Sequence, residues 1–517
     1  MLRFRPNLHP GYLALLAVPI LALMVWLAPS IVPAAKAGGY PSFPADTTWF
    51  NVSRPLTENE LQGRVVLLDF FTPGCINCIH MIPIQQKLKQ KFGDDLLVIG
   101  VTSPKFSASQ DAANMAPFLR RYGIDEPVFI DAGMSWWQHY GVVAWPTLLL
   151  LDPHGKVIHS FVGERSYEQM AAPIAAAITQ AKTANQLTRP ILPLQPLPPD
   201  EHVFALPTKV AIQGNDIAIS DTGRNQILIY DKAGKRLASI GAGHAGFADG
   251  SYSHAEFNRP QGLAFAGETL YVADTDNQRI RAIDLKHHRV STVAGNGQRM
   301  PGITGARHPR DIALNSPWGL AYTDDQLFIA MAGDHQIWRF LPAKNQLAPY
   351  AGSGREGLRD GARLNADFAQ SSGLAYHAGN LYVADPESSS IRQINLGTGL
   401  VVTLIGKGLF NFGNQDGLAN QAQLQHPQGL AYLDHALYIA DTFNNAIRKL
   451  DLNTLQVTTL TRQLAQPNGL AVLDDQHLLV ADTNHDRMVA VDIRTGAITP
   501  WPASSSPSTV PSNPAGS

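Results

Sequence analysis

The sequence predicts two folded domains of different class, an α/β sandwich with a central sheet followed by an all-β propeller. Three observations support this prediction. The chain has 517 residues, which is too long for a single hydrophobic core. Residues 45–182 alternate apolar strand-like runs with amphipathic helical segments, whereas residues 203–501 repeat one strand-rich unit. Residues 183–202 are rich in proline and predict a stiff, extended linker.

The segment 1–37 has the features of an export signal or a membrane anchor. Arg3 and Arg5 precede an apolar run over about residues 12–32, and an A-x-A pattern ends at Ala37. The run is long for a signal peptide and nearly long enough to span a bilayer, so cleavage and retention both stay open. Both outcomes place the rest of the chain across the membrane. We therefore expect a periplasmic or otherwise extracytoplasmic protein, secreted or anchored to the inner membrane.

Composition argues against several classes of partner. The net charge is −2, and the chain carries no basic stripe that would favour nucleic acid. A zinc ribbon would need a second C-x-x-C pair, and the histidines lack the H-E-x-x-H spacing of a metal site. We therefore expect neither a metal nor another cofactor. Residues 502–517 are rich in serine and proline and are expected to be disordered.

The first domain is expected to place its strands in one central sheet with helices packed against it. The apolar runs and the helical spacings mark the elements. Strands are predicted at 65–71, 96–101, 127–130, 147–152 and 157–161, and helices at 79–92, 108–122 and 167–182.

The two cysteines of the chain, Cys75 and Cys78, lie between the first of these strands and a helix-like segment. A C-x-x-C pair in this context is typical of a redox dithiol. At a helix N-terminus the dipole and the free N–H groups favour the thiolate of Cys75. Cys75 is therefore the candidate nucleophile and Cys78 the resolving thiol, which releases the product from a mixed disulfide.

The second domain repeats the pattern Pro-x-Gly-Leu-Ala, then Leu-Tyr-Val-Ala-Asp, then x-Ile-Arg-x-Ile-Asp. Six copies are recognisable, each with about four short strands, which predicts six propeller blades. Glycine-rich inserts lengthen several repeats, and three of them contain Asp-Gly, at Asp249, Asp360 and Asp416. We expect these loops to gather on one rim, where binding usually resides.

Three repeats carry an acid and an arginine seven residues apart. The simplest interpretation is an ion pair between neighbouring strands, and a ring of ligand-binding arginines is the alternative. The pairs are Asp274/Arg281, Asp385/Arg392 and Asp441/Arg448, and blade three has Met331 and Trp338 in their places.

Cys-Ile-Asn-Cys at 75–78, Trp-Pro-Thr at 145–147 and the repeats together resemble the NHL-repeat-containing thioredoxin-like proteins. The resemblance covers about residues 45–501 and implies a thioredoxin-like α/β sandwich followed by a six-bladed NHL β-propeller. It also implies that Asp69 is a buried acid that exchanges a proton with Cys78. It implies a cis Pro146 facing the dithiol, with Trp145 and Thr147 in the substrate groove. The alternatives are a water-facing Asp69 and a Trp145 that only packs in the core.

The sequence also departs from the thioredoxin pattern. Gly74 precedes the first cysteine, where thioredoxins usually carry tryptophan, and no proline lies between the cysteines. His80 would raise the thiolate character of the pair if it were protonated and near, but we expect an exposed helical histidine. C-x-x-C pairs have reduction potentials that range from strongly reducing to strongly oxidising, and both directions of electron transfer stay open for this pair.

Three functions are compatible with these features. The first is a periplasmic thiol–disulfide oxidoreductase whose propeller binds a protein partner or substrate and whose dithiol needs a redox partner. The second is an interaction scaffold in which the propeller is the functional part and the thioredoxin-like domain senses redox state or is inactive. The third is a hydrolase or lyase centred on the propeller, which would need metal ligands converging at its channel.

Overall fold

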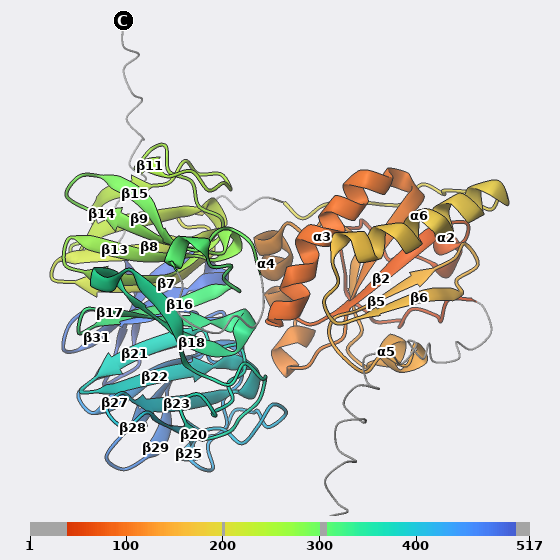
Figure 1. The fold of residues 1–517 in the computed structure, drawn as a ribbon. Coiled ribbons are helices and arrows are strands. Elements are labelled where there is room, and N and C mark those ends of the chain that lie inside the picture. The colour runs from red at the N-terminus through yellow and green to blue at the C-terminus, as the bar shows by residue number, and fades with distance from the viewer. Residues whose placement is uncertain (1–38, 199–201, 300–307, 503–517) are drawn as a thin grey trace, which may run out of the picture.

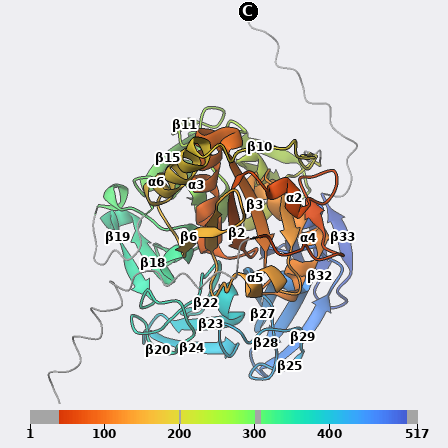
Figure 2. The ribbon, with the colours of Figure 1, turned by 90° about the vertical axis from the view of Figure 1, so that its right-hand side faces the viewer.

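The computed structural model describes residues 39–198, 202–299 and 308–502. The predicted export signal and most of the predicted disordered tail lie outside these ranges. Within them, no helix is both long and apolar enough to cross a bilayer. The predicted fold class is confirmed, since an α/β domain is followed by a six-bladed β-propeller. The α/β domain sits on one face of the propeller (Figure 1), over the centre of the ring of blades (Figure 2).

A six-stranded sheet forms the centre of the α/β domain, in the order β1-β4-β3-β2-β5-β6. The pairs β2–β3 and β3–β4 are parallel and the other pairs are antiparallel. The strands are β1 (Trp49–Phe50), β2 (Val65–Phe71), β3 (Leu96–Thr102), β4 (Val128–Ile130), β5 (Thr147–Leu151) and β6 (Val157–Val162). The helices are α2 (Glu58–Leu61), α3 (Ile76–Phe92), α4 (Ala112–Tyr122), α5 (Ser135–His139) and α6 (Tyr167–Thr183).

Side chains of alternate residues of β2 pack on opposite faces of this sheet. Leu67 is fully buried in a cluster with residues of α3 and α6, and the neighbouring Leu68 is fully buried in a cluster with Trp136 of α5. Every residue of β2 is buried, and all but one of its residues are apolar, as expected for a strand covered on both faces of the sheet. Its one charged residue, Asp69, is therefore placed inside the domain.

Each blade is an antiparallel sheet. The strand nearest the propeller axis is the first strand of the blade, or the second where a two-residue strand precedes it. Blade 1 has β7 (Pro207–Gln213), β8 (Asp216–Asp221), β9 (Gln226–Asp231) and β10 (Arg236–Ile240). Blade 2 has β11 (Gly250–Ser251), β12 (Pro260–Ala266), β13 (Thr269–Asp274), β14 (Arg279–Asp284) and β15 (Arg289–Ala294). Blade 3 has β16 (Pro317–Thr323), β17 (Gln326–Met331), β18 (Gln336–Leu341) and β19 (Gln346–Ala351).

The other three blades follow the same plan. Blade 4 has β20 (Gly361–Ala362), β21 (Gly373–His377), β22 (Asn380–Asp385), β23 (Ser390–Asn395) and β24 (Leu400–Ile405). Blade 5 has β25 (Gly417–Leu418), β26 (Gly429–Leu433), β27 (Ala436–Asp441), β28 (Ala446–Asp451) and β29 (Gln456–Thr461). Blade 6 has β30 (Leu470–Val472), β31 (His477–Asp482), β32 (Arg487–Asp492) and β33 (Ile498–Trp501).

The glycine of each Pro-x-Gly motif lets neighbouring blades approach closely at the axis. A Cβ atom added to Gly429 would lie 2.3 Å from the carbonyl oxygen of Asn468 in the next blade. The ring closes where blade 6 meets blade 1, and there the Thr483 hydroxyl donates to the Pro207 carbonyl at 2.7 Å. At the same junction, a Cβ atom added to Gly469 would lie 2.4 Å from the Thr208 carbonyl oxygen, so a side-chain hydrogen bond and a close glycine contact join the first and last blades.

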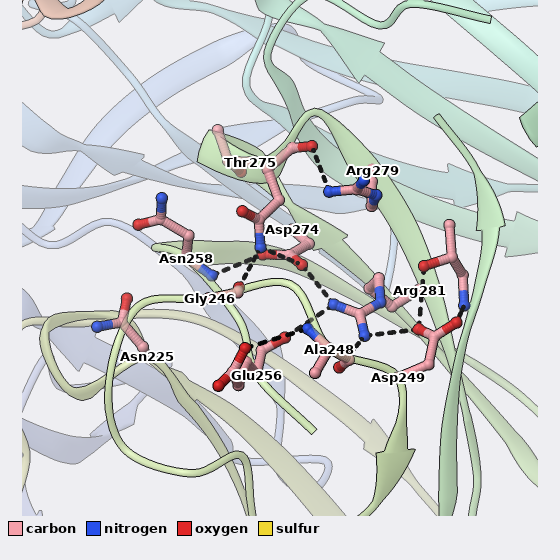
Figure 3. A network of polar contacts seen from close by, with 12 residues as sticks. Asn225, Gly246, Ala248, Asp249, Glu256, Asn258, Asp274, Thr275, Arg279 and Arg281 are labelled. Carbon is pink, nitrogen blue, oxygen red and sulfur yellow. Dashed lines mark hydrogen bonds and ion pairs between the residues drawn. The ribbon is translucent and has the colours of Figure 1, made fainter. Parts of the chain in front are cut away.

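The predicted ion pairs between strands are present and extend to the glycine-rich inserts. Fully buried Arg281 donates to Asp274 and to Asp249 of the insert, each at 2.7 Å (Figure 3). The same arginine also donates to the carbonyls of Ala248 and Glu256. Arg392 and Arg448 hold Asp360 and Asp416 in the same way. The inserts add β11, β20 and β25 to the outer edges of their blades, so the arginines stabilise blade architecture.

The proline-rich linker lies against the α/β domain. Ser53 donates its backbone N–H to the Pro193 carbonyl at 2.8 Å, and Gln195 donates to the Asn51 carbonyl at 2.9 Å. Leu194 forms an isolated antiparallel bridge with Val52. The extended segment thus follows the edge of the domain before the chain enters the propeller.

Candidate functional site

The dithiol lies at the N-terminus of α3. Cys75 is the N-cap residue, and its sulfur accepts a hydrogen bond from the Cys78 N–H at 3.2 Å. Both thiols are free, and Cys75 and Cys78 are only 6% and 3% exposed. Burial raises the pKa of Cys78 well above its ordinary value, and the neighbouring Cys75 adds to the shift. The two thiols therefore have different environments. Cys75 caps the helix, whereas Cys78 is an inner thiol that resists ionisation.

Asp69 lies buried behind the dithiol. Burial raises the pKa of its carboxyl to about 7, although a hydrogen bond from Gln85 at 2.8 Å acts in the opposite direction. The second carboxyl oxygen of Asp69 has no hydrogen-bond partner. The charge of Asp69 also contributes to the raised pKa of Cys78, so the two groups interact. This is an environment in which a carboxyl group can exchange a proton near neutral pH.

The Trp145–Pro146 peptide bond is cis, as the resemblance implies. Trp145 packs against the hydrophobic cluster that contains both cysteines, and its ring centroid lies 4.5 Å from that of Trp137. Thr147 opens β5, opposite Phe70 of β2, and its hydroxyl donates to the Ala144 carbonyl. The loop thus lies beside the dithiol, with Trp145 half-buried.

The propeller covers the dithiol through one position of its repeat. In all six blades the residue that directly precedes the Pro-x-Gly position of the repeat, one to four residues before the innermost strand, has a positive φ between 46° and 62°, although none is glycine. We call these six residues the docking ring: Leu206, Arg259, Ser316, Gln370, His426 and Gln466. Left-handed backbone at non-glycine residues is uncommon and costs free energy, so its recurrence marks a built feature.

Members of the docking ring contact the α/β domain. The Ser316 hydroxyl lies 2.7 Å from Nε2 of His80, and Arg259 donates to the Arg121 carbonyl at 3.1 Å. Leu206 and Gln466 line spaces that they share with residues of α4. The ring therefore surrounds the N-terminal half of the dithiol helix and its neighbours.

Gln370 reaches the start of α3 itself. Its side-chain oxygen accepts the Ile76 N–H at 2.8 Å, and Ile76 is the first residue of that helix. The Gln370 amide nitrogen donates to Glu356 at 3.0 Å. A propeller side chain thus contacts the backbone next to Cys75.

A buried ion pair also joins the two domains. Lys105, which follows β3, lies 2.5 Å from Oε2 of Glu387 in blade 4, and both side chains are nearly inaccessible. Beside this pair, Phe106 packs edge-on against Phe443 with centroids 5.2 Å apart. Charge neutralisation and aromatic packing together keep the domains in contact.

Gly74 explains why tryptophan is absent before Cys75. Its φ of +89° favours glycine, and an added Cβ would lie 2.7 Å from the imidazole of His426. His426 is itself buried and stacks on Phe443 with centroids 4.3 Å apart. The space that a tryptophan side chain would need is therefore occupied by the propeller.

The expectation of an exposed His80 is wrong. His80 is buried, its Nδ1 lies 2.7 Å from Glu164, and its Nε2 faces Ser316. Burial lowers the pKa of His80, although Glu164 acts in the opposite direction. The helix lies beneath the propeller at this point, which the spacing of one helix does not reveal. His80 therefore belongs to the domain interface and is not a solvent-facing cation.

Sequence reasoning did not find the docking ring. The available signal was a position that stands directly before Pro-x-Gly in four of the blades and varies in identity while the motif itself repeats. Five of the six residues precede a proline, which restricts their conformation, but that restriction favours extended backbone and does not predict the positive φ. In the described parts of the chain, no group of three His, Cys, Asp or Glu is arranged to hold a metal ion.

Comparison with known proteins gives the same two-part organisation. The Redoxin family matches residues 44–178, and the NHL repeat matches residues 257–283, 314–340 and 464–490. NHL repeat-containing protein 2 of Bos taurus is 36% identical over 518 residues, which cover 89% of this chain and 71% of the bovine protein. SUPPRESSOR OF QUENCHING 1, a chloroplastic protein of Arabidopsis thaliana, is 36% identical over 493 residues, 88% of this chain and 47% of the plant protein.

The α/β domain by itself is similar to bacterial redox proteins. Thiol-disulfide oxidoreductase ResA of Bacillus anthracis is 32% identical over 111 residues, which cover 22% of this chain and 62% of that protein. The bovine and plant matches span both domains, whereas this match stays within the first. The chain, a redoxin domain followed by an NHL-repeat propeller, belongs to the family of NHL repeat-containing protein 2.

Proposed function

We propose that the protein is a thiol–disulfide oxidoreductase that acts through Cys75 and Cys78. The observation that carries the proposal is the combination of an N-cap cysteine, which accepts a hydrogen bond from Cys78, with a buried Asp69 behind the pair. The similarity of the α/β domain to ResA supports the same reaction class.

In the reducing direction, the Cys75 thiolate attacks one sulfur of a substrate disulfide. That S–S bond breaks, the leaving sulfur takes up a proton, and Cys75 is left in a mixed disulfide. Asp69 accepts the proton of Cys78, whose thiolate then attacks Cys75. The substrate leaves as a dithiol and the protein holds a Cys75–Cys78 disulfide. Two electrons have passed to the substrate, and a redox partner must return them.

The environment of Asp69 suits this role. A carboxyl group with a pKa of about 7 can take up and release a proton near neutral pH. Cys78 needs such a base because burial raises the pKa of its thiol. We assign Asp69 as the proton acceptor for Cys78, and we assign Trp145, Pro146 and Thr147 to the groove for the substrate.

The proposal is tested by disulfide reduction with a protein disulfide as substrate and dithiothreitol as the source of electrons. Wild type should turn over and Cys75→Ser should be inactive. Cys78→Ser, reduced and then mixed with the substrate after the dithiothreitol is removed, should accumulate the mixed disulfide, which mass spectrometry detects. Absence of turnover together with absence of the trapped mixed disulfide would contradict the proposal.

The burial of Cys75 favours a second candidate, an interaction scaffold whose dithiol reports redox state. Cys75 is 6% exposed beneath the propeller, so a protein disulfide needs the domains to separate before it can react. In this role the propeller binds the partner and the dithiol modulates binding. A double Cys75→Ser, Cys78→Ser variant that keeps full partner binding and full cellular function would favour a scaffold that does not depend on the dithiol.

We further propose that the propeller binds a protein partner or substrate and that the protein works outside the cytoplasm. The argument for the location is the arginine-led apolar segment within residues 1–37. If that segment is not cleaved, it anchors the protein to the membrane. Fractionation of cells that produce the full chain tests the location and the cleavage together.

A further inference from the structure

We propose that Gln370 is a positioning residue of the dithiol site, which lowers the nucleophilicity of Cys75 for as long as the propeller is docked. The residue lies in blade 4, on the docking ring, 294 positions from the backbone group that it contacts. The inference rests on the proposed redox role of the dithiol and adds a form of regulation to it.

The geometry gives Gln370 a direct link to the thiol. The Ile76 N–H, immediately after Cys75, donates to the Gln370 side-chain oxygen at 2.8 Å. The contact is buried, and Gln370 is only 6% exposed. The Gln370 backbone N–H points to His335 and its amide nitrogen points to Glu356. Two hydrogen bonds thus fix the amide so that its oxygen faces the start of α3, and the third holds the Gln370 backbone.

A thiolate at a helix N-terminus is stabilised by the free N–H groups of the first turn and by the helix dipole. When Gln370 accepts the Ile76 N–H, one of these donors is no longer free to stabilise negative charge on Cys75. The amide oxygen also brings a partial negative charge to the backbone group next to Cys75. Docking therefore favours the protonated thiol, and separation of the domains frees the helix N-terminus.

Other groups around the site determine the background on which Gln370 acts. The Cys78 N–H remains as a donor to the Cys75 sulfur, so some stabilisation of the thiolate persists in the docked state. The titratable and charged groups that surround this end of α3 are Asp69, Cys78, His80, Lys105, Arg121, Tyr122, His335, Glu356, Glu387 and His426. A substitution that changes only Gln370 leaves all of these in place.

The test is a pH titration of Cys75 in the full chain that carries Cys78→Ser, followed by the ultraviolet absorbance of the thiolate. Gln370→Ala should move the midpoint to lower pH, which raises the thiolate fraction below the midpoint by about two- to fivefold, the usual effect of charge near a helix end. Gln370→Glu should move the midpoint to higher pH. This measurement needs no turnover, so its outcome is separate from that of the disulfide-reduction assay.

Gln425→Ala is the matched control. Gln425 also crosses the interface, where its side-chain oxygen accepts from the Ser107 hydroxyl at 3.1 Å, but no hydrogen bond links it to α3. Its titration should overlay that of the parent. Small-angle scattering on each variant reports whether the domains stay docked.

Two results would overturn the proposal. One is a Gln370→Ala midpoint that equals those of the parent and of Gln425→Ala. The other is a shift that appears only together with an expanded scattering profile, or that has the same sign in Gln370→Ala and Gln370→Glu. The first result would show that the Gln370–Ile76 hydrogen bond does not affect Cys75, and the second would assign the shift to domain separation and not to that hydrogen bond.

Discussion

Two positions of the propeller repeat show opposite behaviour. On two neighbouring strands of blades 2, 4 and 5 the same acid and arginine recur as a buried ion pair, and Figure 3 shows the network around the pair of blade 2. On the docking ring the backbone conformation recurs in all six blades while the side chain differs in every blade except for a repeated glutamine. Recurrence of a side chain indicates architecture, whereas recurrence of a backbone with varied side chains indicates a surface fitted to an irregular neighbour.

The largest effect should come from the repeated network. Arg281→Ala leaves Asp274 buried without its partner and should lower the free energy of unfolding by ~3–5 kcal/mol. Urea denaturation measures the loss. Arg279→Ala is the control, because Arg279 is only partly buried and lies outside the ion pair. If both variants lost the same free energy of unfolding, the buried network would contribute no more to stability than the residues around it.

The ion pair between the domains should come next. Glu387→Ala leaves the Lys105 ammonium buried and unpaired, which should weaken docking by ~2–4 kcal/mol. A double-mutant cycle with Lys105→Ala, read by denaturation and by the rate of Cys75 alkylation, isolates the pair. Coupling near zero would show that the contact contributes little to docking.

A smaller effect is expected at Gly74. Gly74→Ala combines a strained positive φ with a Cβ 2.7 Å from His426, and should cost ~1–3 kcal/mol and accelerate alkylation of Cys75. Gly93→Ala is the matched control, since Gly93 has a positive φ but no atom within 4 Å of the added Cβ. It should lower stability slightly and leave alkylation unchanged. The same alkylation rate in both variants would contradict the role of Gly74 in docking.

The smallest effect is expected from Asp69 and depends on pH. The folded-state pKa of about 7 exceeds the ordinary value of 3.8, so the folded protein binds the extra proton between these values and loses stability as pH rises through that window. Asp69→Asn removes the loss, and should be more stable than wild type by ~1–2 kcal/mol at about pH 8 but not at about pH 4. Denaturation at both pH values checks this. A difference that does not depend on pH would place the Asp69 carboxyl in a more polar environment.

The sequence predicts the repeated and the long elements of both domains, but it does not predict the shortest ones. The six repeats and the apolar runs predict the blades and the main strands of the α/β sheet, because each depends on local periodicity. The short elements β1 and α5 escape prediction, since two and five residues are too few to show a period. The interstrand ion pairs are predictable because acid and arginine recur at fixed spacing.

The candidate site divides in the same way. Cys75, Cys78, Asp69 and the Trp145–Pro146 loop can be found from motif spacing, because all belong to one domain. Gln370 and the surroundings of His80 cannot, since they depend on how two domains meet. The one local sign of that meeting is Gly74, which stands where thioredoxins usually have tryptophan and whose added Cβ would collide with the propeller.

The central claim, a redox dithiol covered by the propeller, is tested most directly by the size dependence of thiol modification. The full chain is reacted with a small maleimide and with a maleimide that carries a polyethylene-glycol chain of several kilodaltons, and the labelling rates of Cys75 are compared. The account predicts that the large reagent reacts far more slowly in wild type and that Gly74→Ala narrows the difference. Equal rates for the two reagents in wild type would contradict it.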